Sequence, residues 1–288
     1  MKLKNILKLG FLSLAVGLML TGCGKTDDSG NDKAGSADAG NVGSVDRSGG
    51  NIETVTPQKG DLIAVFEIEG YGTIKAVLFP DIAPVGVENF RLLANDGFYK
   101  GLTIHRVMEQ FMFQGGSTNG NGTGGDAAVN DGSFGIETSD SARHFYGALC
   151  YANAGGQNST QFYIVNADES VSVESMADQY RQMLDVYKSY AAAATLEDEK
   201  AYYEYYAAET QKTYDALTSM SREVMDLYSE RGGTPFLDGS YTVFGQVYEG
   251  FDVIDSLSKA EVIDNGSGEK SKPVDTIVIK DITVSEFE

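Results

Sequence analysis

Short stretches of alternating apolar and polar residues recur along the chain from residue 61 onwards. The stretches over 62–68 and 72–79 are joined by a Gly70-Tyr71-Gly72 turn, and another covers 276–284 near the end. Such alternation predicts strands that bury one face and expose the other. The recurrence of strands this short predicts a mainly β domain.

Two segments instead carry apolar residues three and four positions apart, as amphipathic helices do. Pro84 opens the first, and Gly97 is placed to end it. The second lies near the end of the chain and carries Phe251, Ile254 and Leu257. Many short strands with two helices suit a closed antiparallel barrel whose ends are covered by the helices.

A longer helical pattern fills residues 168–232. Thr195 with Asp198 resembles a capping box between two helical stretches, and Gly232 with Gly233 is expected to end the second one. The pattern therefore predicts an inserted antiparallel hairpin of two helices. Its seam positions are Val173, Met176, Tyr180, Met183, Tyr187, Tyr190 and Ala194 in the first helix, and Tyr203, Ala207, Thr210, Tyr214, Leu217, Ser221, Val224 and Tyr228 in the second.

This seam is built from tyrosine, alanine and methionine more than from leucine, and Tyr202, Tyr205 and Tyr206 lie outside it. The hairpin either packs on itself or on the barrel, or it offers its Met- and Tyr-bearing surface to client chains or a partner protein. A short loop could close the same gap. The barrel is therefore expected to fold without the hairpin.

Polar residues interrupt the apolar stretch 104–116. Arg106 and Gln114 stand among Phe111, Met112 and Phe113, and no partner for the arginine is visible in the sequence. A buried guanidinium or amide without a partner destabilises a fold. Two interpretations follow: a pocket with apolar walls and a few directed polar groups, or a half-buried pair of strands whose polar face meets water.

Three later motifs favour the pocket. The sequence YANAG covers 151–155, TQFYI covers 160–164, and FLDGSYTVFGQV covers 236–247. Together with HRVMEQFMFQGG over 105–116, and in this order, they resemble the signature of the cyclophilin family of peptidyl-prolyl isomerases. The resemblance extends over most of 61–288. It implies a closed antiparallel, eight-stranded β-barrel capped by two helices, in which a short connection is replaced by the hairpin of 168–232.

The resemblance also implies the roles of individual residues. Arg106 corresponds to the arginine that favours the twisted prolyl bond, and Gln114 and Asn153 correspond to groups that hold the substrate backbone. The remaining positions that match the family's binding surface are Phe111, Met112, Tyr163 and Leu237 around the proline ring, Ala152, Ala154 and Gln161 along the groove, and Phe236 and Tyr241 at the rim.

Rotation about a prolyl bond meets a barrier of roughly 18–20 kcal/mol that arises from amide resonance. No covalent bond breaks, so the reaction needs neither a nucleophile nor a metal, and no cofactor is expected. The enzyme has only to bind the twisted amide better than the planar forms. Because no proton moves, His105 and His144 are expected to have packing roles.

Three positions depart from the family pattern. Phe236 stands where a tryptophan is frequent, Tyr241 where a histidine is frequent, and Tyr163 where a phenylalanine is frequent. The first change removes an indole donor that the family uses to bind the drug cyclosporin. None removes the arginine or the glutamine, so catalysis is expected to survive.

The start of the chain reads as an export segment. Residues 1–22 carry lysines followed by an apolar run too short to span a bilayer comfortably, and Leu20-Thr21-Gly22-Cys23 resembles the bacterial lipoprotein box. This resemblance implies cleavage before Cys23 and lipid on its sulfur. Residues 23–60 are rich in Gly, Ser, Asp and Asn, which predicts a flexible linker. The protein is therefore expected outside the cytoplasm, lipid-anchored to a bacterial cell membrane.

The net charge and the cysteine content restrict the kinds of partner and the role of Cys150. The net charge of −20 argues against nucleic acid as a partner. Cys150, in an apolar stretch, is expected to be a small buried hydrophobe. The favoured function is an isomerase that assists the folding of exported proteins through their Xaa-Pro bonds. The alternative is a chaperone-like binding module that works through the helical insertion, with incidental turnover.

Overall fold

The computed structural model describes residues 55–288. The signal segment, Cys23 and nearly all of the linker expected from the sequence lie outside this range. The helices are α2 (Pro84–Asn95), α3 (Val173–Ala193), α4 (Glu197–Thr218), α5 (Arg222–Arg231) and α6 (Phe251–Ser258), with 3-10 turns η1 (Asn130–Gly132) and η2 (Pro235–Leu237). The strands are β1 (Leu62–Ile68), β2 (Gly72–Leu78), β3 (Thr103–Ile104), β4 (Arg106–Met108), β5 (Met112–Gly115), β6 (Phe134–Gly135), β7 (Ala148–Ala154), β8 (Gln157–Val165), β9 (Val243–Glu249), β10 (Val262–Asp264), β11 (Lys270–Pro273) and β12 (Ile277–Glu286).

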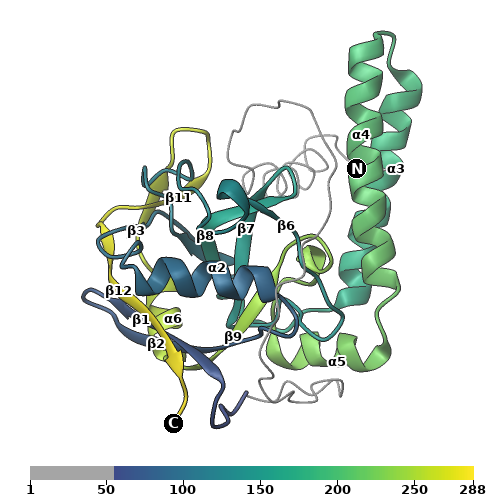
Figure 1. Cartoon of the computed structure of the whole chain (residues 1–288). Coiled ribbons are helices and arrows are strands. Elements are labelled where there is room, and N and C mark those ends of the chain that lie inside the picture. The colour runs from purple at the N-terminus through teal and green to yellow at the C-terminus, as the bar shows by residue number, and fades with distance from the viewer. Residues whose placement is uncertain (1–54) are drawn as a thin grey trace.

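One antiparallel sheet curls into a nearly closed barrel (Figure 1). Within the described range, nine strands follow one another in the order β3-β12-β1-β2-β9-β7-β8-β5-β4, and β6 pairs with β8. The two edges meet at His105, which separates β3 from β4 and whose N–H donates to the Gln114 carbonyl at 3.0 Å. The predicted β-barrel is confirmed, with nine strands rather than eight, because the chain pairs with β12 before His105 and with β5 after it.

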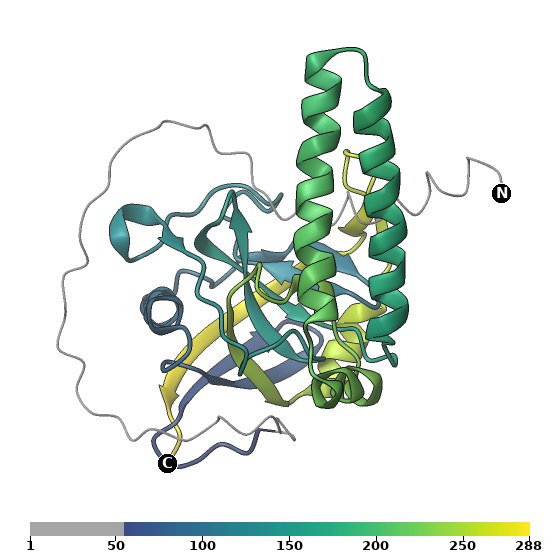
Figure 2. The same ribbon diagram turned by 90° about the vertical axis from the view of Figure 1, so that its right-hand side faces the viewer.

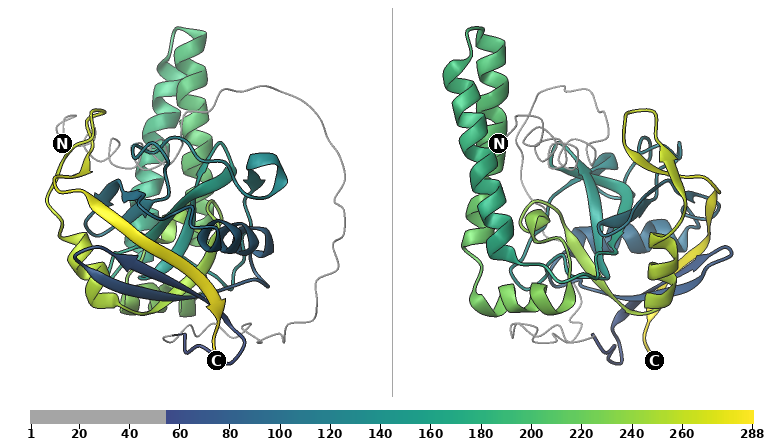
Figure 3. Two further views of the ribbon diagram at one scale, coloured as in Figure 1. Left: turned by 60° about the vertical axis from the view of Figure 1, so that its left-hand side comes forward. Right: turned by 180° about the vertical axis from the view of Figure 1, so that it is seen from behind.

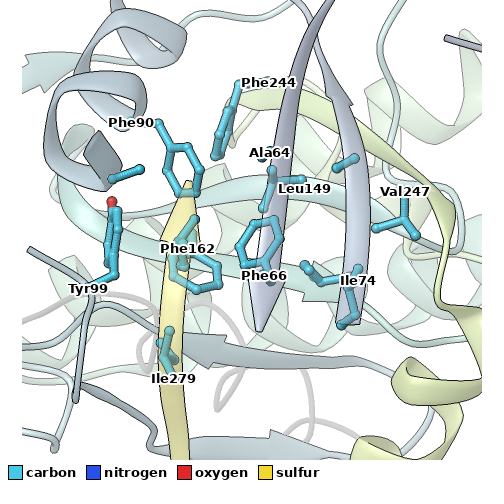
Figure 4. Close-up of a cluster of buried hydrophobic side chains, with 14 of the residues drawn as sticks. Ala64, Phe66, Ile74, Phe90, Tyr99, Leu149, Phe162, Phe244, Val247 and Ile279 are labelled. Carbon is cyan, nitrogen blue, oxygen red and sulfur yellow. The ribbon is translucent and has the colours of Figure 1, made fainter. Parts of the chain in front are cut away.

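Strand alternation gives the sheet two apolar faces, as successive side chains point to opposite sides. In β8, Phe162 and Ile164 face the barrel interior, whereas Tyr163 and Val165 face outward. The inner cluster includes aromatic pairs such as Phe90 and Phe162, whose ring centroids lie 5.8 Å apart. Figure 4 shows Ala64, Phe66, Ile74, Phe90, Tyr99, Leu149, Phe162, Phe244, Val247 and Ile279 of this inner cluster.

The outward-facing apolar residues form a second group, here called the outer cluster. They come from β1, β2, β5, β7, β8 and β9 and from the segment around η2. Their burial on the outside of a barrel requires a cover, which the loops and the insertion supply. The members used below are Phe111, Met112, Cys150, Ala152, Tyr163, Leu237 and Tyr241, with Phe236 packed against them.

Two helices lie on opposite sides of the barrel, as the sequence predicts. In α2, Pro84 is at the first helical position, and Gly97 follows the C-cap with φ of +74°, which suits glycine. The helix α6 begins after Gly250. In Figure 1 α2 lies in front of the barrel, and in the rear view of Figure 3 α6 lies in front. Within residues 55–288, no helix has both the length and the apolarity to cross a bilayer.

The insertion contains three helices rather than two. The long helices α3 and α4 pack antiparallel and project beyond the barrel (Figure 2). The predicted second helix breaks after Thr218, because Ser221 accepts a hydrogen bond from the Val224 N–H and so caps a new helix, α5. The predicted capping box at Thr195 is wrong, since the N-cap of α4 is Leu196 with no side-chain bond. Gly232 ends α5 with φ of +73°, as expected.

The base of the insertion is joined to the barrel by its own apolar cluster. Leu217 and Tyr228 are fully buried there, and the rings of Tyr228 and Phe145 lie 4.4 Å apart. Of the arrangements that the sequence left open, the hairpin therefore packs on the barrel at this end, and folding of the barrel without it stays a prediction. The base cluster consists of Phe145, Val173, Ala177, Leu217, Met220, Leu227 and Tyr228.

Candidate active site

A row of side chains crosses four neighbouring strands on the outer face of the barrel. Arg106 in β4 lies opposite Gln114 in β5, Gln114 lies opposite Tyr163 in β8, and Tyr163 lies opposite Cys150 in β7. Residues paired in register on adjacent strands point to the same face. The register thereby brings together residues that lie up to 57 positions apart in sequence. The row is polar at its Arg106 end and apolar at its other end.

Arg106 is buried and ion-paired. Its Nε donates to Oε1 of Glu269 at 2.7 Å and its Nη2 to Oε2 at 2.7 Å, a bidentate arrangement. Both side chains are about 5 % exposed. Burial alone would raise the pKa of Glu269, but its hydrogen bonds and ion pair with Arg106 lower it below the usual value. Nothing in the sequence indicates this partner, because Glu269 lies 163 positions away in a polar loop.

A chain of amides continues from the arginine. Nη1 of Arg106 lies 3.4 Å from Oε1 of Gln114, a long contact for a hydrogen bond. The Gln114 amide donates to Oε1 of Gln161 at 3.0 Å, and the Gln161 amide donates to the Gly122 carbonyl at 2.9 Å. The orientation of both glutamines is therefore fixed by the protein, and the loop that carries Gly122 closes this end of the row.

The outer cluster lies beside the guanidinium. The Phe111 ring is 5.8 Å from the Arg106 guanidinium carbon and stacks on the half-buried Phe236 ring at 5.9 Å. Leu237 follows Phe236 and is 3 % exposed. Tyr241 lies edge-on to Tyr163 at 6.2 Å, and burial raises its pKa to about 12, although the charge of Arg106 opposes this. Apolar surface and a directed cation thus share one site.

The β7–β8 turn holds the remaining residues proposed from the sequence. Asn153 is 7 % exposed, and its side chain accepts from the Gly156 N–H and donates to the Ser240 carbonyl, each at 3.2 Å. Both the oxygen and the nitrogen of its side-chain amide are therefore hydrogen-bonded within the protein. Ala152 is buried beside it in the outer cluster, and Ala154 is partly exposed. The Asn153 contact joins this turn to the segment that carries Phe236, Leu237 and Tyr241.

The chain is similar to known proteins in sequence and in fold. Residues 63–284 match the family model described as cyclophilin type peptidyl-prolyl cis-trans isomerase/CLD. The chain belongs to the cyclophilin family. Two staphylococcal relatives, each named "Putative peptidyl-prolyl cis-trans isomerase", come from Staphylococcus aureus (33 % identity; 80 % of this chain, 94 % of the relative) and Staphylococcus haemolyticus (35 %; 78 % and 91 %). The predicted isomerase class is thereby confirmed.

Solved structures support the fold. A cyclophilin type peptidyl-prolyl cis-trans isomerase of Cryptosporidium parvum aligns with a TM-score of 0.51 and 21 % identity over 79 % of this chain and 99 % of its own. The same protein crystallised in the presence of the dipeptide Ala-Pro aligns with a TM-score of 0.50, also at 21 % identity, over 78 % and 99 %. This cyclophilin therefore shares the fold of these structures.

A buried hydrogen-bonded chain links the outer cluster of this cyclophilin to the insertion. The Tyr163 hydroxyl lies 3.0 Å from Nε2 of His144, whose Nδ1 lies 2.8 Å from Oδ1 of Asp238. Asp238 also accepts from Arg143 at 3.0 Å and from the Tyr228 hydroxyl at 2.8 Å. Burial favours a higher pKa for Asp238, but its hydrogen bonds with His144 and then Tyr228 lower it below the usual value. The hydroxyl of Tyr163, one of the departures from the family, thus has a partner.

His144, expected to have a packing role, is the centre of that chain. His105 is different, because neither ring nitrogen has a hydrogen-bond partner within the described residues. Burial, together with the neighbouring Arg106 charge, lowers its pKa to about 4. Cys150 is fully buried, and burial raises the pKa of its thiol. The expected role of Cys150 as a small hydrophobe is therefore confirmed.

Proposed function

We propose that this cyclophilin accelerates rotation about Xaa-Pro bonds at the site formed by Arg106 and the outer cluster. The observation that carries the proposal is the placement of a buried guanidinium directly beside buried apolar side chains. The proline ring would lie against Phe111, Met112, Tyr163 and Leu237, with Phe236 and Tyr241 at the rim. Gln114 and Gln161, oriented by each other, would face the substrate backbone, together with the turn that carries Ala152, Asn153 and Ala154.

Catalysis would come from stronger binding of the twisted amide than of the planar amide. As the prolyl bond twists, resonance is lost and the prolyl nitrogen becomes a better hydrogen-bond acceptor. A guanidinium donor at that nitrogen stabilises the twisted state and does little for the planar one. A low-dielectric setting strengthens the interaction. The side chains of the protein supply every element of this mechanism.

The test is Arg106→Ala in the purified full chain. The variant should lose most of its turnover of an Xaa-Pro tetrapeptide while its substrate affinity changes less, because the lost contact belongs to the twisted state. Circular dichroism and thermal unfolding report whether the variant is folded. Arg91→Ala, which removes an exposed arginine on α2 that pairs with Glu88, is the matched control. Full activity in folded Arg106→Ala would refute this role.

We further propose that the enzyme acts on exported proteins at the outer surface of a bacterial membrane, held by lipid on Cys23. Support comes from the lipoprotein-like sequence over 20–23 and the linker-like composition of 23–60. A lipid anchor on a long flexible linker would keep the barrel close to chains that emerge from export. Proline-containing segments of such chains are the proposed substrates.

A second candidate function is client binding by the insertion. Its outer end exposes a group of large side chains: Tyr205 is 60 % exposed and Leu196 is 67 % exposed, and Tyr190 and Tyr202 are also exposed. The inner part of the insertion reaches the site, since α4 packs against η2, which contains Phe236 and Leu237. Exposed tyrosines of this kind could hold extended chains beside the isomerase site.

A further inference from the structure

The hairpin formed by β10 and β11 is built around one carboxylate. Asp264 accepts from the N–H groups of Gly266 and Gly268 at 2.7 and 3.3 Å, and Asn265 accepts from the Ser267 N–H at 2.9 Å. The Asn265 N–H donates to the Glu269 carbonyl at 2.8 Å. These bonds fix the tight turn that precedes Glu269, which is 6 % exposed although the six residues before it are partly or fully exposed.

The Glu269 carboxylate occupies one edge of the Arg106 guanidinium. Glu269 accepts from Nε and Nη2, each at 2.7 Å, and the Met108 sulfur lies 3.3 Å from Nη2. Nη1 has one contact within the described residues, the 3.4 Å approach to Gln114. Of the three guanidinium nitrogens, Nη1 therefore has the weakest hydrogen bond to the protein. One of its two hydrogens is left for a bond to the substrate.

We infer that Glu269 is a positioning residue for catalysis: it clamps the Nε–Nη2 edge of Arg106 and thereby directs Nη1 toward the prolyl nitrogen. The inference rests on the proposed role of Arg106. It also assigns a function to the β10–β11 hairpin, whose strand β11 packs against β4. The residue that holds the arginine is supplied by a segment outside the barrel sheet.

A clamp of this kind explains why a buried ion pair is present at all. Taking both charges out of water costs about as much as their attraction returns, so such pairs are weak sources of stability. They are effective at fixing geometry, because the bidentate fork allows one orientation of the guanidinium plane. An unclamped arginine of this length has many rotamers, and a misplacement of about 1 Å can cost about a hundredfold in rate.

Glu269 can in principle also lower turnover, and this opposite effect predicts a change of opposite sign in the test. A carboxylate against the guanidinium also reduces its positive potential, so removing Glu269 could strengthen Nη1 as a donor. Positioning predicts that turnover falls when Glu269 is removed, and charge quenching predicts that it rises. The two outcomes have opposite signs.

The experiment compares Glu269→Ala and Glu269→Gln with Glu261→Gln, an exposed glutamate next to β10 that undergoes the same charge change. In the purified full chain, kcat for a tetrapeptide should fall about ten- to a hundredfold in Glu269→Ala, with KM nearly unchanged. Glu269→Gln, which keeps one acceptor oxygen, should fall less. Glu261→Gln should match the unaltered protein. The Nε–H resonance of Arg106 should exchange slowly with water in the unaltered protein and rapidly in both Glu269 variants.

Unchanged or increased kcat in folded Glu269→Ala would overturn the inference. So would a failure of both Glu269 variants to fold, because the pair would then serve the fold alone. Arg106→Ala is measured alongside to separate the two levels of the argument. If Arg106→Ala keeps full activity, the proposed mechanism fails; if it is inactive while the Glu269 variants remain active, only the positioning role fails.

Discussion

The hydroxyl of Tyr228 in α5 donates a 2.8 Å hydrogen bond to Oδ2 of Asp238, the residue that follows Leu237 in the outer cluster. Tyr228 is fully buried and Asp238 is 8 % exposed. A hydrogen bond to a buried charged group contributes about 1.5–3 kcal/mol. The last helix of the insertion is therefore part of the wall that holds the site.

The insertion should accordingly divide into a removable part and an essential part. Replacing Asp185–Glu209 with a short Gly-Ser turn keeps the base cluster and Tyr228, so stability and tetrapeptide turnover should remain close to those of the full chain. Replacing Ser170–Arg231 removes the bond to Asp238 and uncovers Phe145. We expect this second variant to lose at least about 2 kcal/mol of stability and much of its activity.

Urea unfolding and tetrapeptide assays on both variants check this division, and equal behaviour of the two would contradict it. The variant shortened at 185–209 also tests client binding, because it lacks the exposed Tyr190, Leu196, Tyr202 and Tyr205. Under that hypothesis it should catalyse refolding of a proline-limited protein more slowly while tetrapeptide turnover is unchanged. Equal rates on the protein substrate would end the client-binding hypothesis.

Tyr228→Phe isolates the hydroxyl in the same region. The substitution leaves Oδ2 of Asp238 with Arg143 as its remaining partner, so the free energy of unfolding should fall by about 1.5–3 kcal/mol. Tyr214→Phe is the matched control, since Tyr214 packs on the base cluster and no hydrogen bond of its hydroxyl occurs within residues 55–288. A loss of the same size in both variants would show that the Asp238 bond contributes nothing specific.

Phe236 should make this cyclophilin less sensitive to cyclosporin than family members with tryptophan at that position. One absent hydrogen bond weakens inhibition by roughly three- to tenfold. Phe236 stacks on Phe111 at 5.9 Å with an interplanar angle of 27°, a geometry that an indole can keep while adding its N–H. Phe236→Trp should therefore recover part of the affinity in an inhibition assay. Unchanged inhibition would place the difference elsewhere in the site.

His105 should make the protein sensitive to mild acid. Its pKa is about 4 in the folded chain and near 6.5 when unfolded, so only the unfolded state takes up a proton between these values. The free energy of unfolding should fall as the pH drops from 6.5 toward 4, by up to about 3 kcal/mol. Urea unfolding of the unaltered chain and of His105→Leu at pH 7 and pH 4.5 measures this, and the loss should be smaller in the variant. Equal losses would show that other groups account for it.

The anchor can be tested separately from the site. Cys23→Ser in the full chain should abolish lipid attachment, because a serine hydroxyl is a much weaker nucleophile than the thiol that the lipoprotein pathway modifies. Acyl labelling and detergent partitioning measure the outcome, with Cys150→Ser as the control at the other cysteine. Normal labelling of the Cys23→Ser protein would refute the lipoprotein prediction.

The sequence by itself determined the local elements and the family. Alternation over 62–68 and 72–79 predicted β1 and β2, and Pro84 and Gly97 marked the ends of α2, because these signals depend only on neighbouring residues. The four motifs also identified a set of residues that the sheet register brings together at Arg106, Gln114 and Tyr163.

Only the tertiary structure decided how that set is held. Glu269 clamps Arg106 from 163 positions away, and Tyr228 reaches Asp238 through a helix that the period alone merged with α4. Such contacts depend on where loops and helix ends meet in space, and no spacing rule encodes them. The short strands β6, β10 and β11 were missed for the same reason: two to four residues carry too little periodicity, and their pairing partners fix them.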